Sequence, residues 1–280
     1  MIPHIRVMTP ADIPAGMRLK DLAGWNQTSE DWGRFLQESP EGCFVAECDG
    51  RVAGTVTTIV YEGRVAWVGM VLVDPDFRGR GMGTTLLETA VGHLDARPVP
   101  CVKLDATPQG KPLYATLGFK VEYEIERWML KRTASPASPA TGRIEDLTAV
   151  FALDGEVFGA NRSAVLRSVA DAAPELGWVA RQGATLEGYA LGRKGSRADH
   201  LGPWISRNAR AARKLLENFL EHSRRDTIFV DVPARNPWAR PLVQEKGFQF
   251  SRPLTRMVRG ENRHPGRPDL VCAILGPELG

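Results

Sequence analysis

The chain has 280 residues, and its 43% hydrophobic and 25% charged composition excludes a protein that is disordered throughout. The net charge is only +3, which argues against a nucleic-acid partner. No apolar run approaches the ~20 residues that span a membrane and no signal-peptide pattern opens the chain, so we expect a cytoplasmic protein without a membrane partner.

The first half of the chain predicts alternating strands and helices. An apolar strand at 42–46 meets a β-branched strand at 51–60 through an Asp-Gly turn, and Glu62-Gly63 leads into a long apolar strand at 65–73. A helix follows at 82–93, then a strand at 99–104 and a short helix at 111–117 that Gly118 ends. The order is typical of an α/β fold built on a mixed sheet.

A segment of small residues and prolines near the midpoint predicts a linker at 132–143. We therefore expect one domain at 1–131 and a second at 144–280. The segment 111–119 is echoed at 240–248, and Leu86-Leu87 and Leu215-Leu216 repeat with the same separation of 129 residues. This internal similarity predicts two copies of one fold.

One loop carries an unusual concentration of glycine. Its sequence, from residue 78 to residue 83, is Arg-Gly-Arg-Gly-Met-Gly, between the long apolar strand and a helix start. Glycines let a backbone approach a ligand closely, and a helix N-terminus offers unpaired N–H groups, so the loop predicts an anion site suited to a pyrophosphate. The glycine spacing differs from that of dinucleotide-binding folds and of Walker loops.

This loop and the segment Pro-Leu-Tyr-Ala-Thr-Leu-Gly-Phe at 112–119 resemble the two motifs of the GCN5-related N-acetyltransferase (GNAT) superfamily. The resemblance implies two tandem domains, each a mostly antiparallel sheet with a central, splayed parallel strand pair flanked by helices. It also implies acetyl-CoA as co-substrate and no metal. The donor-binding residues would be Val71, Leu72 and Val73 beside the pantetheine arm, and Arg78, Gly79, Arg80, Gly81, Met82, Gly83 and Thr84 around the pyrophosphate.

The resemblance assigns proton donation to the leaving thiolate to Tyr114, whose alternative role is to cover a core against Phe119. A general base is harder to find, because the strand at 67–73 has no carboxylate. Asp105 ends the next strand, and three roles remain open for it: base, anchor for a substrate ammonium, or cap of the helix near Lys111. A water chain to a more distant carboxylate is equally compatible with the sequence.

The segment 22–32 would flank the acceptor in this fold. Trp25 and Trp32 could form an aromatic wall for an ammonium group, with Asn26 and Gln27 orienting it. The alternative is two core tryptophans followed by a capping box at 28–31.

The second copy lacks the glycine cluster, and Val243 stands where Tyr114 stands in the first copy. We therefore expect an active first domain and a degenerate second domain that covers the acceptor site. The predicted activity is acetyl transfer from acetyl-CoA to a primary amine of a small molecule, by direct attack in a ternary complex, in a monomer or homodimer. The alternatives are a non-catalytic acyl-CoA sensor and a protein N-acetyltransferase.

Overall fold

The computed structural model describes residues 3–133, 144 and 146–280. The expected linker at 132–143 lies, apart from its first two residues, outside this range. The first half of the chain forms these strands and helices: β1 (His4–Val7), α1 (Ile13–Leu22), α2 (Ser29–Glu38), β2 (Cys43–Cys48), β3 (Arg51–Tyr61), β4 (Val65–Val73), α3 (Met82–Asp95), β5 (Cys101–Ala106), α4 (Lys111–Thr116) and β6 (Lys120–Lys131).

The second half repeats the order from α1 to β6 and then adds one strand, as the internal similarity predicts for the repeated part. Its elements are α5 (Thr148–Phe158), α6 (Ser163–Ala172), β7 (Trp178–Gln182), β8 (Thr185–Lys194), β9 (Asp199–Ser206), α7 (Ala209–His222), β10 (Thr227–Pro233), α8 (Ala239–Glu245), β11 (Gln249–Gly260) and β12 (Val271–Ala273). Short 3₁₀ turns lie at Pro10–Asp12, Pro75–Phe77, Pro174–Leu176 and Pro268–Leu270. Among the described residues, no helix has the length and apolar character of a membrane span.

The predicted turns explain why neighbouring strands pair. Asp49 and Gly50 have φ values of 52° and 72°, and Glu62 and Gly63 have values of 54° and 66°. Positive φ at both central residues gives a turn whose twist matches that of an antiparallel hairpin. These turns place β2, β3 and β4 side by side in antiparallel order, which confirms the prediction for this part of the sheet.

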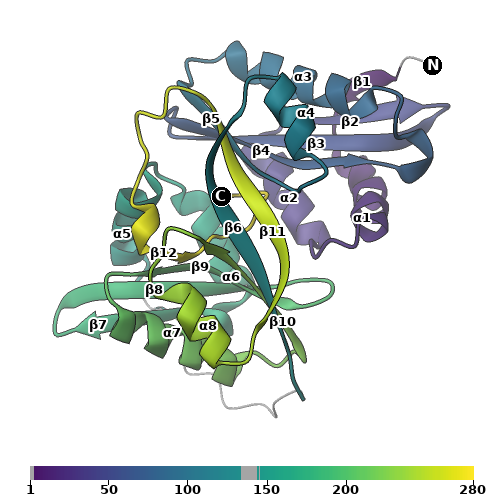
Figure 1. Ribbon diagram of the computed structural model, residues 1–280. Helices are drawn as coiled ribbons and strands as arrows, with labels where there is room; N and C mark the ends of the chain where they lie inside the picture. Colours follow the sequence, from purple (N-terminus) through teal and green to yellow (C-terminus); the bar gives the residue numbers. More distant parts are fainter. Residues whose placement is uncertain (1–2, 134–143, 145) are drawn as a thin grey trace.

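The two halves share one twelve-stranded sheet and exchange a strand at its centre. The order along the sheet is β1-β2-β3-β4-β5-β11-β6-β10-β9-β8-β7, with β12 beside β9 (Figure 1). Strand β11 of the second half thus lies between β5 and β6, and β6 of the first half lies between β11 and β10. The expected ranges 1–131 and 144–280 are therefore segments of the chain and do not correspond to two separate sheets.

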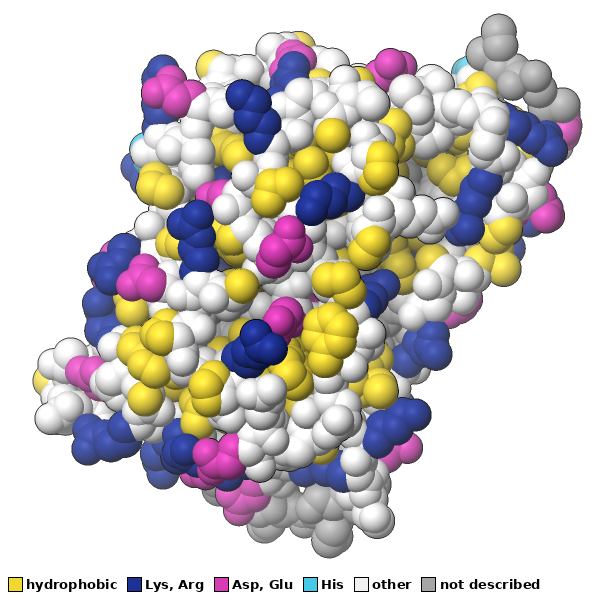
Figure 2. All heavy atoms as spheres, viewed as in Figure 1, with side chains coloured by type: hydrophobic (Ala, Val, Ile, Leu, Met, Phe, Trp, Pro, Cys, Tyr) yellow, Lys and Arg dark blue, Asp and Glu magenta, His cyan; other side chains and the backbone are white. Residues whose placement is uncertain are grey.

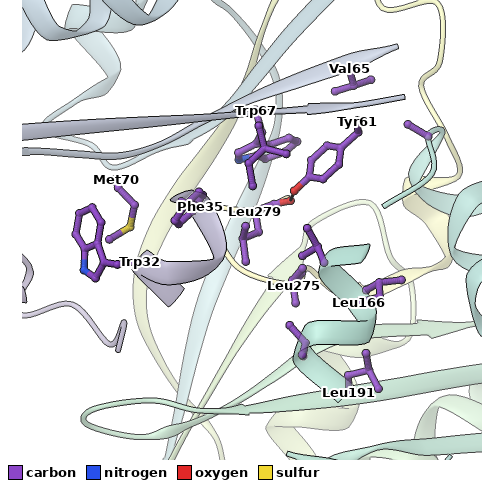
Figure 3. Close-up of a cluster of buried hydrophobic side chains, with 14 of the residues drawn as sticks. Trp32, Phe35, Tyr61, Val65, Trp67, Met70, Leu166, Leu191, Leu275 and Leu279 are labelled. Carbon is purple, nitrogen blue, oxygen red and sulfur yellow. Dashed lines mark hydrogen bonds between the residues drawn. The ribbon is translucent and has the colours of Figure 1, made fainter. Parts of the chain in front are cut away.

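The largest hydrophobic cluster lies where the halves meet. It joins Trp32, Phe35 and Trp67 of the first half to Leu166 and Leu191 of the second. Figure 3 shows these side chains converging on the segment 274–280, which runs between the halves and contributes Leu275 and Leu279. The hydroxyl of Tyr61 donates a hydrogen bond to the carbonyl of Leu279 (3.0 Å), and Trp67 Nε1 donates one to the carbonyl of Pro277 (3.0 Å). Burial of this shared apolar surface stabilises the halves as one unit.

Candidate functional site

The central parallel strands separate toward their carboxyl ends. Strands β4 and β5 are in register only at Ala66–Val102 and Trp67–Lys103. A bulge in β4 follows at Met70, which has a φ of 50° and whose carbonyl accepts a hydrogen bond from Thr55 Oγ1 (2.8 Å). The β4 edge from residue 68 to residue 73 therefore faces a gap instead of β5. An extended ligand could add there as a strand adds to a sheet.

A cavity of about 750 Å³ occupies this gap. We call its two parts the loop end and the inner end. The loop end is lined by residues 77–79 and 81–84 with Leu113, and residues 68–73 of β4, together with Tyr114 of α4, line the cavity between the loop end and the inner end. The inner end is lined by Trp25, Gln27, Asp105, Arg127, Arg252, Leu254, Pro277 and Glu278.

The glycine loop opens on the loop end of the cavity. Gly79 and Gly81 have φ values of 72° and 80°, and a Cβ at either position would meet no atom within 4 Å. Gly81 is the N-cap of α3 and supplies no side chain to cap the first N–H groups. These groups and the helix dipole are therefore available to an anion at the loop. This loop geometry fits the pyrophosphate of the expected co-substrate.

All but one of the residues predicted to bind the donor line the cavity. Val71, Leu72, Val73, Arg78, Gly79, Gly81, Met82, Gly83 and Thr84 all line it. The structure does not place Arg80 among the lining residues; its guanidinium packs 5.6 Å from the Phe77 ring centroid. Arg78 Nε donates a hydrogen bond to the carbonyl of Val73 (3.1 Å), so this arginine also fixes the path of the chain as it leaves β4.

Tyr114 lines the cavity from helix α4. Its ring packs edge-on against Phe119, with 6.3 Å between the centroids, so it covers the core there while it lines the cavity. Burial raises the pKa of Tyr114 to about 12. The phenol therefore keeps its proton at neutral pH, as a proton donor must.

Asp105 lines the inner end, but its carboxylate is already engaged. Both of its oxygens accept hydrogen bonds from the guanidinium of Arg256, each at 2.8 Å. Burial raises the pKa of Asp105 and Arg256 opposes this shift. The N-cap of α4 is Gly110 rather than Asp105. The structure thus rules out the helix cap, whereas the roles of base and ammonium anchor stay predictions for a carboxylate that is held in a buried ion pair.

The segment between α1 and α2 divides into lining and structural residues. Trp25 is half-buried and lines the cavity, as does Gln27. Trp32 is 0% exposed in the shared core, which corrects the expectation that it forms an acceptor wall. Asn26 lies outside the cavity lining because its side chain binds the second half: Oδ1 accepts from the backbone N–H groups of Arg197 and Ala198 (2.9 Å each).

Sequence analysis did not identify two ionic residues at the inner end of the cavity. These are Arg252 on β11 and Glu278 in the segment 274–280. Both are more than 100 positions from the glycine loop. Glu278 lies against β4, since a Cβ on Gly69 would come within 3.0 Å of its Cα. Glu278 thus brings a carboxylate residue next to β4, whose residues 67–73 include no Asp or Glu. A comparison of equivalent positions in the two repeats was the one available signal for Arg252.

The equivalent gap in the second half is filled by the chain itself. Leu72 pairs with Thr55 across β3 and β4, and Ile205 pairs with Tyr189 across β8 and β9. Strand β12 occupies the free side of β9, with Val271 opposite Ile205 and Ala273 opposite Trp204. The helix that follows is capped, because Asn208 Oδ1 accepts from the N–H of Ala211 (2.9 Å). A ligand would find neither an open strand edge nor a free helix terminus there.

The comparisons with known proteins agree with this geometry. The model of the acetyltransferase (GNAT) family matches residues 16–119, and a model of an acetyltransferase (GNAT) domain matches residues 150–272. The chain belongs to the GNAT acetyltransferase family. It carries two GNAT domains in tandem, and its relatives and domains indicate an N-acetyltransferase.

Similarity to two curated relatives extends over most of the chain. Holothin acyltransferase of a Pseudoalteromonas species is 26% identical over 91% of this chain and 87% of its own length. The uncharacterized N-acetyltransferase YitH of Bacillus subtilis is 23% identical over 83% of each chain. The structure of a candidate acetyltransferase from Pyrococcus horikoshii superposes with a TM-score of 0.82 and 22% identity, covering 99% of this chain and 96% of that one. This last likeness shows a common fold.

The surface of this GNAT protein matches its small net charge. Figure 2 shows basic and acidic side chains interspersed over one face, and within the coloured part of that view they form no continuous basic surface. Among the residues that the structure describes, no cluster of three or more His, Cys, Asp or Glu side chains is arranged to hold a metal. The expected acetyl transfer needs no metal, because its reacting groups are an amine and a thioester.

Proposed function

We propose that the first GNAT domain binds acetyl-CoA in the cavity and transfers the acetyl group to a primary amine of a small molecule. The observation that supports this most is the contrast at the two central strand pairs. In the first half an open β4 edge, an uncapped α3 N-terminus and Tyr114 face one cavity. In the second half β12 and Asn208 satisfy the corresponding backbone groups.

The pyrophosphate would bind the N–H groups at Gly81–Gly83, with Arg78 nearby. The pantetheine arm would run along residues 71–73, which directs the thioester toward the bulge at Met70. The amine nitrogen then attacks the thioester carbon, so that a C–N bond forms and the C–S bond breaks. The sulfur takes the hydroxyl proton of Tyr114, and the amine gives up a proton to water or to a carboxylate of the inner end.

The size and origin of the inner end support a small acceptor. A volume of about 750 Å³ for the entire cavity is in the range of small-molecule sites. Arg252, Leu254, Pro277 and Glu278 come from the second half of the chain and limit access to the reacting end. A protein chain would have to enter this space through its terminus or a single lysine.

Calorimetric titration with acetyl-CoA followed by a thiol-release assay over a set of amines tests the proposal. One binding site per chain and amine-dependent release of CoA thiol are expected. Binding without release for every amine would favour an acyl-CoA sensor. Absence of binding by the folded protein would contradict the proposal.

A further inference from the structure

The exchanged strands are related by an approximate two-fold axis, which makes residue-by-residue comparison of the halves possible. Leu254 lies opposite Ile125, Arg256 opposite Tyr123 and Arg252 opposite Arg127. Positions 123, 125 and 127 of β6 correspond to 252, 254 and 256 of β11, with the separation of 129 residues found in the sequence. The axis therefore passes between Ile125 and Leu254.

Most ionic groups near this axis are paired in the same way on both sides. Arg256 binds Asp105 through two hydrogen bonds, and Arg127 binds Asp231 through two hydrogen bonds of 2.8 and 2.7 Å. Each pair joins a β6 or β11 arginine to the aspartate of the neighbouring strand. Neither arginine therefore has its charge free for a ligand.

The equivalent positions 123 and 252 differ in chemistry. Tyr123 forms a hydrogen bond of 2.7 Å with Arg256 Nη1, so the neutral residue satisfies the arginine opposite it. Its counterpart is Arg252, which faces Arg127 with a charge of the same sign. Like charges directly opposite each other destabilise a strand pair. Asp231 takes up the charge of Arg127, but Arg252 still gains no hydrogen bond from the residue opposite it, whereas Tyr123 does.

Arg252 forms no hydrogen bond or ion pair with any residue that the structure describes, although it is half-buried and lines the inner end of the cavity. Burial and the neighbouring charge of Arg127 lower the pKa of Arg252 to about 10, and the carboxylates of Asp231 and Glu278 oppose this shift. A guanidinium that lines a cavity without a hydrogen bond of its own is placed to bind an anionic ligand there.

Two buried oxygen acceptors at the same inner end also lack donors. Gln27 is 7% exposed, and its Oε1 accepts no hydrogen bond from the residues that the structure describes. Glu278 is 3% exposed, and neither carboxylate oxygen has a hydrogen-bond donor in that part of the chain. Arg193 Nη2 approaches Glu278 Oε1 to 2.8 Å without hydrogen-bond geometry and balances the charge. Amine N–H groups would satisfy both side chains.

We propose that the acceptor is an amino acid or a similar small amino carboxylate, bound through its carboxylate by Arg252 and through its amine by Gln27 and Glu278. This inference rests on the proposed acetyl transfer and specifies its substrate class. The ammonium form gives one proton to the Glu278 carboxylate, and the neutral amine attacks the thioester. Glu278 releases that proton to solvent, and the second proton, which the nitrogen loses as the amide forms, restores the Tyr114 hydroxyl after it has protonated the sulfur.

The location of Arg252 separates it from the phosphates of the co-substrate. Arg252, Leu254 and Arg256 alternate along β11 and share one face of the sheet. Arg256 packs 4.5 Å from the Trp67 ring centroid, in the core beneath α2, whereas the glycine loop leads into α3 and its separate core. A single unpaired arginine also matches the one charge of a carboxylate better than the two charges of a phosphate.

The test compares amines in matched sets at saturating acetyl-CoA. Each set contains an amino acid, its carboxamide and its decarboxylated amine, for example leucine, leucinamide and isoamylamine, with phosphoethanolamine as a phosphate-bearing amine. We expect kcat/KM for the amino acid to exceed that for its amide by about 10- to 100-fold. Arg252→Gln should abolish this preference through KM, and Arg252→Lys should retain part of it.

Two controls separate binding from folding. Arg240→Gln changes an arginine whose side chain is 59% exposed and should leave the preference intact. Arg252→Gln should not lower the melting temperature, because it removes an unpaired half-buried charge, and it should leave the Kd for acetyl-CoA unchanged. A structural role for Arg252 predicts the opposite result for the melting temperature.

Each contrary outcome has a distinct meaning. Equal or better use of amides, decarboxylated amines or phosphoethanolamine by the wild type overturns the carboxylate inference and leaves acetyl transfer standing. If the protein binds acetyl-CoA but no set is acetylated, N-acetylleucine is titrated against the CoA complex. Binding that Arg252→Gln abolishes supports the inference, and no binding to the wild type overturns it. Failure to bind acetyl-CoA contradicts the proposed function itself.

Discussion

The two halves of the chain have the same element order apart from β1 and β12, yet they differ at the end of the central strand. In the first half Gly81 begins α3 without a capping side chain, and β4 has a free edge beyond Trp67. In the second half Asn208 caps α7 and β12 covers β9. The backbone groups that a ligand would satisfy in one half are satisfied by the chain in the other. A fold can therefore lose a ligand site by pairing its own polar groups.

The largest expected effect comes from placing a negative charge at the open helix terminus. Asp and Asn both tolerate the positive φ of Gly81, so Gly81→Asp and Gly81→Asn differ mainly in charge. We expect Gly81→Asp to weaken acetyl-CoA binding more than 100-fold in calorimetry. Gly81→Asn should weaken it much less, because the left-handed backbone at residue 81 differs from the extended backbone in which Asn208 caps α7. In the second half, Asn208→Ala should cost about 1 kcal/mol of stability and create no second site. If that variant bound a second molecule of acetyl-CoA, the second half would still contain a donor site, contrary to this comparison.

The next effect concerns the position at which Tyr114 and Val243 differ. Tyr114→Phe should lower kcat about 100-fold in the thiol-release assay and leave the Kd for acetyl-CoA unchanged. Because the pKa of Tyr114 is raised to about 12, the donor stays protonated from pH 6 to pH 10. The wild-type rate should therefore rise with pH as the acceptor amine deprotonates, with no decline below about pH 11. An alkaline decline near pH 9 that Tyr114→Phe removes would contradict this.

A third prediction concerns a feature that the halves share. The pairs Arg256–Asp105 and Arg127–Asp231 are equivalent and buried. Asp105→Asn and Asp231→Asn should each lower the free energy of unfolding by about 3–5 kcal/mol, because each leaves a buried guanidinium uncompensated. Combining Asp231→Asn with Arg127→Gln should recover part of that loss. Urea unfolding measures all three variants, and a large difference between the two single variants would show that the halves are not equivalent here.

The smallest effect concerns one end of the sheet. Arg6 on β1 binds Asp12 through two hydrogen bonds of 2.8 Å and Glu47 on β2 through one of 2.9 Å. Hydrogen bonding to Arg6 lowers the pKa of Asp12 from 3.8 to about 2. A lowered folded-state pKa gives stability that is complete above about pH 4 and is lost as the pH falls toward 2. Asp12→Asn should remove about 1–2 kcal/mol of stability at pH 6 and little at pH 2, as urea unfolding at the two pH values would show.

Local chemistry made much of the fold predictable from the sequence. The turns at Asp49-Gly50 and Glu62-Gly63 and the glycine loop depend on residues that are neighbours in the chain. The assignment of Trp32 to the acceptor wall beside Trp25 was wrong for the opposite reason. Trp25 lies in the loop before α2 and Trp32 lies on α2, and the sequence does not show which of the two rings faces the core. In the structure the ring of Trp32 packs against Gly16, which places it in the core. Asp105 was visible, but its partner Arg256 lies 151 positions away. Arg252 and Glu278 reach the cavity only because β11 and the segment 274–280 cross between the halves.

The exchange of β6 and β11 also bears on how such a chain could arise. A polypeptide with a single repeat would leave its last two strands unpaired with each other, and two identical copies related by a two-fold axis would complete the same sheet. Fusion turns that bimolecular association into an intramolecular one that no longer depends on concentration. It also releases the copies from identity, since each position is then encoded twice and independently. The pair Tyr123 and Arg252, equivalent in place and different in chemistry, shows what that freedom permits.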